Sequence, residues 1–188
     1  MSTRAGHIAE FVITPPDPYG AELAYITRAR LTLGVLTQLI AQAKQSLVLA
    51  SPFIQPNSGL DSGPLADALH GALRRGVGID IVSTGSGLQA LAIENLRRVT
   101  YGRLRLFQPR PNVENERHLG SHAKFCIADN QHAYVGSANL TAPGLAGNLE
   151  MGLLVHGELA LQIKEFWEFL LRTNFFVEVQ TAEKEHQS

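Results

Sequence analysis

The sequence predicts an α/β protein whose central sheet mixes parallel and antiparallel strands and is flanked by helices. Two observations predict this class. From residue 46 to residue 107, apolar runs alternate with segments of helical periodicity, which implies right-handed crossovers and parallel pairing. After residue 121, two extended runs are separated by a very short polar turn, and strands that close in this way pair antiparallel.

The first part of the chain supplies the parallel strands and the helices between them. Apolar residues recur near the helical period between 33 and 43, and the clearest helix spans 64–75. Pro64 suits the first turn of that helix, and Gly76 suits its end. A further helix is expected over 88–99. The expected strands are 11–20, which prolines interrupt, 46–54, 77–83 and 103–107.

The second part of the chain supplies the antiparallel strands. The expected strands are 122–129, 132–139 and 149–155, followed by an amphipathic helix over 158–172. Period-two alternation divides the last of these strands into a polar and an apolar face. Asn148 and Glu150 share the polar face. The apolar face carries Leu149, Met151, Leu153 and Val155.

Length and composition place the chain among folded proteins of a reducing compartment. Its 188 residues are 45% hydrophobic and 18% charged, which fits one domain and excludes a wholly disordered chain. No apolar run approaches membrane-spanning length, and the first residues lack the apolar core of a signal peptide. The single cysteine, Cys126, cannot form an internal disulfide, and we expect it to be a small buried residue. We therefore expect a cytoplasmic protein that is not bound to a membrane.

Positive charge is concentrated in one stretch, although the net charge is only −1. Six of the twelve arginines lie between positions 97 and 117, where two glutamates oppose them. This stretch is either a solvated face or a basic approach to a phosphate site.

A hairpin then concentrates polar side chains on one face. Alternation places His122 and Lys124 together, which is costly on a buried strand unless a polar or anionic group meets them. A two-residue or four-residue turn puts Lys124 opposite Ser137 and His122 opposite Asn139, whereas a three-residue turn would break that register. Glu150 can join this cluster from the next strand.

These residues resemble the HKD signature of the phospholipase D superfamily. The segment HAKFCIAD, six further residues, GSAN and then NLE match His-x-Lys, four residues, Asp, and Gly-Ser-x-Asn. The order of elements from residue 46 onward also fits the family. The resemblance implies a phospholipase D-like sandwich at 31–179, after a lead-in at 1–30 and before a polar tail at 180–188. It also implies a phosphodiesterase that needs no metal and no other cofactor.

The resemblance implies a role for each matching residue. His122 becomes the nucleophile that forms a phosphohistidine, or the acid that protonates the leaving oxygen. Three residues, Lys124, Ser137 and Asn139, hold the non-bridging phosphate oxygens. Glu150 orients the His122 ring, and Asp129 braces the end of the hairpin although it belongs to the motif.

The chain carries one such motif, whereas many members of the superfamily carry two. Single-motif members resemble a bacterial endonuclease type that pairs two chains. We therefore expect a symmetric homodimer in which each subunit contributes one His122 to a shared site.

Three residues outside the motif are candidate substrate contacts. Arg103 and Arg105 share one face of a strand, and His118 lies just before the motif. The alternative for each is a solvated surface side chain.

The opening segment carries a narrower resemblance. EFVITPPDPYG and the helical pattern after it resemble the lead-in of phospholipase D-like proteins of DISARM-type anti-phage systems. The first functional hypothesis is therefore a DNA nuclease in phage defence, with other defence-system proteins as partners. The second is a lipid phosphodiesterase or phosphatidyl transferase, which would need an exposed apolar rim. The third is a non-catalytic nucleic-acid-binding module of a defence complex.

Overall fold

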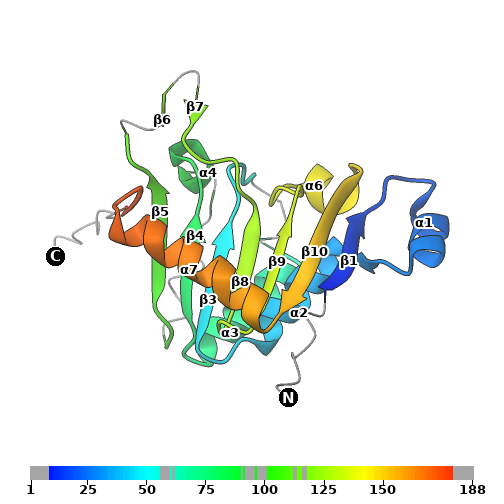
Figure 1. The fold of residues 1–188 in the computed structure, drawn as a ribbon, viewed down its shortest axis with the longest axis horizontal. Helices are drawn as coiled ribbons and strands as arrows, with labels where there is room; N and C mark the ends of the chain where they lie inside the picture. The colour runs from blue at the N-terminus through cyan, green and yellow to red at the C-terminus, as the bar shows by residue number, and fades with distance from the viewer. Residues whose placement is uncertain are drawn as a thin grey trace, which may run out of the picture.

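The computed structural model describes residues 9–55, 60, 62–89, 91, 96, 101–111, 114–115 and 118–179. They form one nine-stranded sheet in the order β11-β5-β4-β3-β8-β9-β10-β1-β2 (Figure 1). Its strands are β1 (Ala9–Thr14), β2 (Arg30–Leu31), β3 (Ser46–Ala50), β4 (Gly78–Val82), β5 (Leu104–Pro109), β8 (Phe125–Ala128), β9 (His132–Gly136), β10 (Glu150–His156) and β11 (Phe176–Glu178). A separate pair is formed by β6 (Glu114–Asn115) and β7 (His118–Leu119).

The expected mixed sheet is confirmed. β3, β4 and β5 pair in parallel, whereas β8 pairs antiparallel with both β3 and β9. β10 continues the antiparallel part through β9 and β1. The helices are α1 (Gly20–Thr27), α2 (Thr32–Gln42), α3 (Pro64–Arg74), α4 (Gly85–Gln89), α6 (Ala142–Ala146) and α7 (Glu158–Arg172).

The helix α3 shows how local sequence sets these elements. Pro64 occupies its first turn, and Leu65, Leu69 and Leu73 are buried along one side. Gly76 follows the helix with a φ of 86°, a conformation that glycine adopts without a steric penalty. The helix therefore begins and ends where its sequence signals lie.

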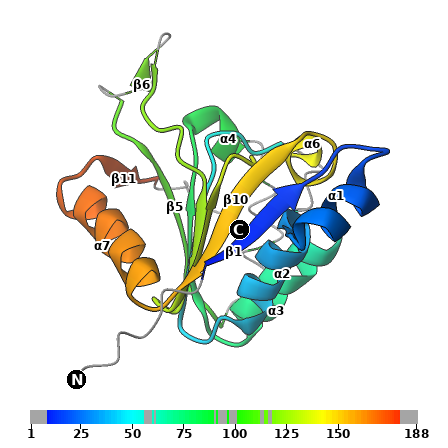
Figure 2. The same cartoon turned by 45° about the vertical axis from the view of Figure 1, so that its right-hand side comes forward.

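Helices cover the two faces of the sheet unequally (Figure 2). α2 and α3 pack on one face over the larger apolar core. Among the helices of the described residues, α7 alone packs on the other face, where Trp167 contacts Phe107, Phe125 and Phe176. One helix can cover only part of a nine-stranded sheet.

The part of that face beyond α7 stays open to solvent. Phe11, Leu153, Val135 and Phe125 lie in one row across β1, β10, β9 and β8. Phe125 is 6% exposed beneath α7, whereas the other three are between 37% and 46% exposed. Met151 on the same face of β10 is also exposed. We call Phe11, Val135, Met151 and Leu153 the uncovered face.

The N-terminal lead-in contributes directly to the sheet. β1 pairs with β10 from Ala9 to Thr14, and β2 adds a short parallel edge strand. α1, which lies between them, has no buried residue. Of the helix expected over 88–99, the structure describes α4 and the buried Leu91 and Leu96, and the rest lies outside the described residues. The tail at 180–188 also lies outside them.

Candidate active site

The candidate site lies where four neighbouring strands end at one edge of the sheet, which also carries α4 and α6 (Figure 1). β3 and β9 finish there, whereas β8 and β10 begin there, because antiparallel neighbours run in opposite directions. The residues 122–124 precede β8, the residues 137–139 follow β9, and Glu150 opens β10. Polar groups beyond the strand ends are free of the sheet ladder and available to a ligand.

The hairpin register differs by one residue from the expected one. Ala128 lies opposite His132, so the turn holds three residues, 129–131. Asp129 and Asn130 adopt left-handed backbone conformations with φ of 51° and 59°. Asp129 thus belongs to the turn and not to the strand, which adds the odd residue that breaks the expected register.

This shift changes which residues oppose each other near the site. The Gly136 amide donates to the Lys124 carbonyl at 3.2 Å, so Gly136 lies opposite Lys124. The expected opposed pairs, Lys124 with Ser137 and His122 with Asn139, are therefore wrong. These residues still gather at one edge, because they lie beyond the strands, where alternation of faces no longer applies.

His122 and Lys124 form the centre of the site. Lys124 Nζ lies 3.1 Å from His122 Nδ1 and donates to the His122 carbonyl at 2.9 Å. Lys124 is 6% exposed, whereas His122 is exposed. Burial lowers the pKa of Lys124, and the charge of Glu150 opposes that shift. An ammonium beside an accessible imidazole presents a positive charge and a nucleophilic nitrogen to the same ligand.

Ser137 and Glu150 form a second polar pair next to this centre. Ser137 Oγ donates to Glu150 Oε2 and accepts from the Met151 amide at 3.1 Å. Within the described residues, Glu150 is hydrogen-bonded to Ser137 and not to the His122 ring. The family resemblance had implied instead that Glu150 orients that ring. Its carboxylate acts on Lys124 through charge.

The position of Gly136 requires glycine for a steric reason that the sequence alone did not reveal. The Tyr134 side chain is 2% exposed and lies across the neighbouring backbone. A Cβ at Gly136 would overlap the Tyr134 hydroxyl, and a Cβ at Gly152 would overlap the ring. Glycine at both positions therefore admits a buried aromatic ring beneath the site.

Asn139 lies in the loop between β9 and α6. Its Oδ1 is 3.4 Å from Ser51 Oγ, which belongs to the segment after β3. Thr141 caps α6 by accepting from the Gly144 amide at 3.2 Å, and Thr14 donates to the Gly144 carbonyl at 3.0 Å. The loop is thus tied to two other segments of the chain.

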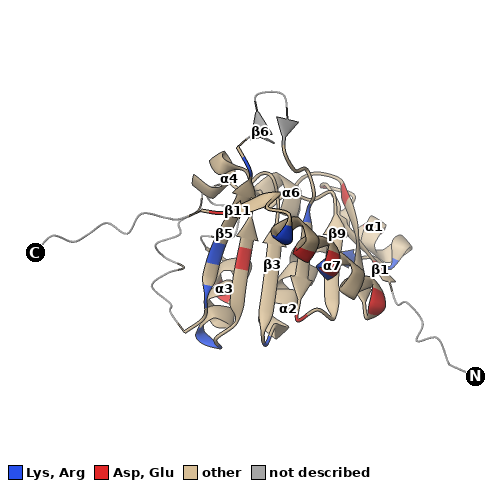
Figure 3. Cartoon of the chain, turned by 60° about the vertical axis from the view of Figure 1, so that its left-hand side comes forward, with Lys and Arg blue, Asp and Glu red and all other residues tan. Residues whose placement is uncertain are grey.

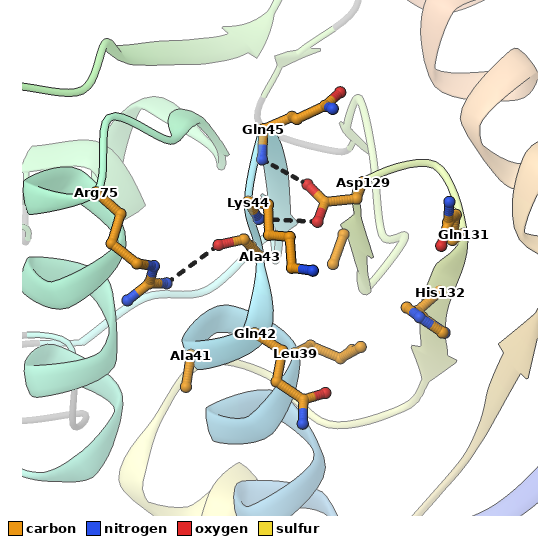
Figure 4. Close-up of a pocket in the computed structure, with 11 residues that line it drawn as sticks. Leu39, Ala41, Gln42, Ala43, Lys44, Gln45, Arg75, Asp129, Gln131 and His132 are labelled. Carbon is orange, nitrogen blue, oxygen red and sulfur yellow. Dashed lines mark hydrogen bonds between the residues drawn. The ribbon is translucent and has the colours of Figure 1, made fainter.

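Asp129 lies at the other end of β8, away from His122. Its carboxylate accepts from the amides of Lys44 and Gln45 at 2.8 and 2.7 Å (Figure 4) and from the Ser46 amide at 3.0 Å. Burial raises the pKa of Asp129. The three backbone hydrogen bonds and the charge of Lys44 together lower it by more, so the pKa of Asp129 is below its ordinary value. These contacts fit the bracing role at the hairpin end.

The structure does not bring Arg103 or Arg105 to the site. Arg105 donates to both carboxylate oxygens of Asp80 at 2.7 and 2.8 Å, so a basic position on β5 lies beside an acidic one on β4 (Figure 3). The Arg103 carbonyl accepts from the Ile79 amide, where β4 begins, and this edge is opposite the site. His118 lies in β7, and its side chain is outside the described residues, as are Arg97, Arg98 and Arg117.

Two residues near the site come from a part of the sequence without any motif. The Phe53 ring lies edge-on to the His122 ring, with 6.2 Å between ring centres, and Ser51 lies beside Asn139. Their only sequence signal is a position just after a buried strand, where functional loops gather. The sheet order was needed to place them, because β3 and β8 are far apart in the chain but adjacent in space.

Cys126 is fully buried, as expected, and burial raises the pKa of its thiol. The described residues contain no group of three or more His, Cys, Asp or Glu side chains placed to hold a metal ion. None of the helices in the described ranges is both long enough and apolar enough to cross a membrane.

Comparison with known proteins connects this geometry to a family. The family model described as "Cardiolipin synthase, PLD-like domain" matches residues 36–170. The DISARM protein DrmC of Bacillus paralicheniformis is 29% identical over 174 residues, which cover 90% of this chain and 66% of that protein. The chain therefore spans about two thirds of the length of that relative.

Solved structures share the fold. NucT from Helicobacter pylori aligns with a TM-score of 0.63 and 18% identity over 89% of this chain and 97% of its own. Nuc from Salmonella typhimurium, a phospholipase D family member, aligns with a TM-score of 0.62 and 20% identity over 94% of this chain and 100% of its own. The phosphatidylserine synthase of Haemophilus influenzae aligns with a TM-score of 0.59 and 15% identity over 91% of this chain and 39% of its own.

Proposed function

The chain belongs to the phospholipase D-like family of phosphodiesterases, and from this premise we propose that it is a metal-independent nuclease that cleaves DNA. One observation carries the proposal: an exposed imidazole lies 3.1 Å from a buried ammonium at an open edge of the sheet. A phosphate that reaches His122 there also meets the charge of Lys124, which offsets the negative charge that develops in the transition state.

The residues account for each step of the proposed reaction. A neutral His122 nitrogen attacks phosphorus, a phosphohistidine bond forms, and the bond to the leaving oxygen breaks. An acid must protonate that oxygen, and a water must then release the phosphate from His122. Asn139 can hold a non-bridging oxygen through its amide nitrogen, and Ser137 can do so when its hydroxyl hydrogen turns from Glu150 to the phosphate, because both side chains lie at the same edge as His122.

The acid that this mechanism needs is the His122 of a second copy of the chain. The uncovered face supports such a dimer, because it exposes large apolar side chains on the same face as α7. A groove of about 440 Å³ connects this face to the site, and its lining includes His122, Lys124, Val135 and Phe166. A second copy packed here would bury apolar surface and bring its own His122 near the first.

Nucleic acid is the proposed substrate because of the relatives. The compared structures include proteins named NucT and Nuc, and the relative named as a DISARM protein supports a setting in phage defence. We propose the same setting here, with other defence proteins as partners.

Cleavage without metal is the first test. Purified wild-type protein should cut DNA in the presence of EDTA, and His122→Ala should reduce cutting by at least ~10³-fold with unchanged folding. DNA binding without cleavage of any nucleic acid would favour the non-catalytic module instead.

Subunit mixing tests the shared site. If each site needs a His122 from both chains, an equal mixture of wild type and His122→Ala that has exchanged subunits retains about one quarter of the activity, whereas independent sites would retain about one half. Leu153→Asp on the uncovered face should give a monomer by sedimentation and lose activity. A fully active monomer would contradict the shared site.

A lipid phosphodiesterase is the second candidate, because the uncovered face is the apolar rim that such an enzyme would need. The family model carries a cardiolipin synthase description, and one structural relative is a phosphatidylserine synthase. Release of phosphatidate from phosphatidylglycerol vesicles, without DNA cleavage, would favour this candidate over the nuclease.

A further inference from the structure

The segment 51–54, just after β3, is held unusually firmly for a loop. The Ser51 amide donates to the Val82 carbonyl at 3.0 Å. The Pro52 carbonyl accepts from Thr84 Oγ1 at 2.8 Å and from Ser83 Oγ at 3.2 Å. Side chains and backbone of the neighbouring β4 end therefore fix this segment at the edge of the sheet that carries His122.

One buried hydroxyl joins this segment to the loop that carries Asn139. Ser51 is 1% exposed, and its Oγ donates to the Phe53 carbonyl at 2.8 Å and accepts from the Leu140 amide at 3.0 Å. The same oxygen lies 3.4 Å from Asn139 Oδ1. Ile54 and Leu140 add a backbone bridge between the two segments. The serine hydroxyl thus lies at the junction of two loops that both reach the site.

Each loop presents one group to the site. Asn139 Oδ1 lies 3.4 Å from Ser51 Oγ, and no described residue accepts a hydrogen bond from the Asn139 amide nitrogen. It therefore remains a donor for a phosphate oxygen. On the other loop, the Phe53 ring lies 6.2 Å from the His122 ring at 77°, a T-shaped contact that restricts rotation of the imidazole.

We propose that Ser51 is a positioning residue of this site: its buried hydroxyl holds the orientation of Asn139 and, through Phe53, the orientation of the His122 ring. This inference rests on the phosphodiesterase function proposed above. Ser51 does not touch the reacting atoms. It acts by keeping a donor and a nucleophile within the narrow geometry that phosphoryl transfer requires.

The test compares Ser51→Ala with a matched control, Ser83→Ala. Ser83 is buried and also donates to the segment, but its acceptor, the Pro52 carbonyl, keeps the hydrogen bond from Thr84. We expect Ser51→Ala to lower kcat for DNA cleavage about 10-fold to 100-fold with KM changed less than about 3-fold. Ser83→Ala should stay within about 3-fold of wild type in both constants.

A second readout does not depend on activity. The chemical shifts of the His122 imidazole, measured by NMR at one fixed pH, should change in Ser51→Ala and not in Ser83→Ala. Phe53→Leu, at a side chain that is 41% exposed, keeps the fold and should move the same resonances and lower kcat. This variant decides the question if Ser51→Ala does not fold.

Equal kcat and equal His122 resonances in Ser51→Ala and Ser83→Ala would overturn the proposal, as would unchanged resonances and kcat in Phe53→Leu. If the wild-type protein cleaves no phosphodiester, the proposed function fails, and the NMR comparison alone still supports or overturns the positioning role.

Discussion

Histidines lie at both ends of the β8–β9–β10 part of the sheet, and their surroundings differ. At one end, His122 is exposed beside the ammonium of Lys124. At the other end, His132 and His156 face each other across β9 and β10 with their Nδ1 atoms 2.7 Å apart, and His156 Nε2 lies 3.0 Å from Glu10 Oε1. A cation beside an open imidazole attracts phosphate, whereas a carboxylate behind two imidazoles repels it.

The second end forms a chain of hydrogen bonds with one consistent proton arrangement. His156 Nε2–H donates to Glu10, so His156 Nδ1 accepts from His132 Nδ1–H when both rings are neutral. Burial lowers the pKa of His132, and the charge of His156 lowers it further. The hydrogen bond from His156 is the main cause that lowers the pKa of Glu10. The side chains of His132, His156 and Glu10 thus link β9, β10 and β1 by hydrogen bonds.

The largest effect should separate the two ends by activity. Lys124→Met removes the buried ammonium beside His122 and should lower kcat for DNA cleavage by about 10² to 10³-fold, because charge in the transition state loses its partner. The matched variant Lys44→Met removes an ammonium near Asp129 and should leave kcat within about 3-fold. Equal losses in the two variants would mean that the ends are not functionally distinct.

The next effect should separate a bracing carboxylate from a site carboxylate. Asp129→Ala leaves three backbone amides without their acceptor and should lower the free energy of unfolding by about 3 kcal/mol, measured by urea denaturation. Glu150→Gln should lower kcat with a loss of stability below about 1 kcal/mol, since Ser137 keeps a neutral acceptor. A stable Asp129→Ala protein with little activity would reverse the two roles.

The smallest effect concerns pH. The unfolded chain binds a proton at His132 near pH 6.5, whereas the folded protein binds it only at lower pH, because the pKa is lowered. This contribution to stability is therefore complete above about pH 6.5 and is lost as the pH falls through the folded-state pKa. The urea midpoint of the wild type should therefore decrease as the pH is lowered from about 7.5 to about 5.5.

His132→Gln supplies the control for this pH effect, because glutamine does not titrate. Its urea midpoint should fall less over the same interval than that of the wild type. An identical fall in both proteins would assign the pH dependence to other groups. DNA cleavage by His132→Gln should match the wild type, since this end of the sheet takes no part in the proposed reaction.

The sequence predicted most of the elements, because their signals are local. α3 and α7 follow apolar periodicity and end at the expected residues to within one position, and the switch from parallel to antiparallel pairing follows from the connections. The residues of the HKD signature were also visible, since His122, Lys124, Ser137 and Asn139 lie close together in the chain. The hairpin register was not, because the left-handed turn at Asp129 depends on amides of 44–46.

By itself, the sequence determined the fold class, the family signature and the residues that carry the proposed chemistry, since each depends on spacing along the chain. Only the tertiary structure decided which residues surround them. It paired Arg105 with Asp80, placed Ser51 and Phe53 beside Asn139 and His122, and left part of one sheet face uncovered. These contacts join segments distant in the chain, and packing across a sheet, unlike periodicity, has no local signal.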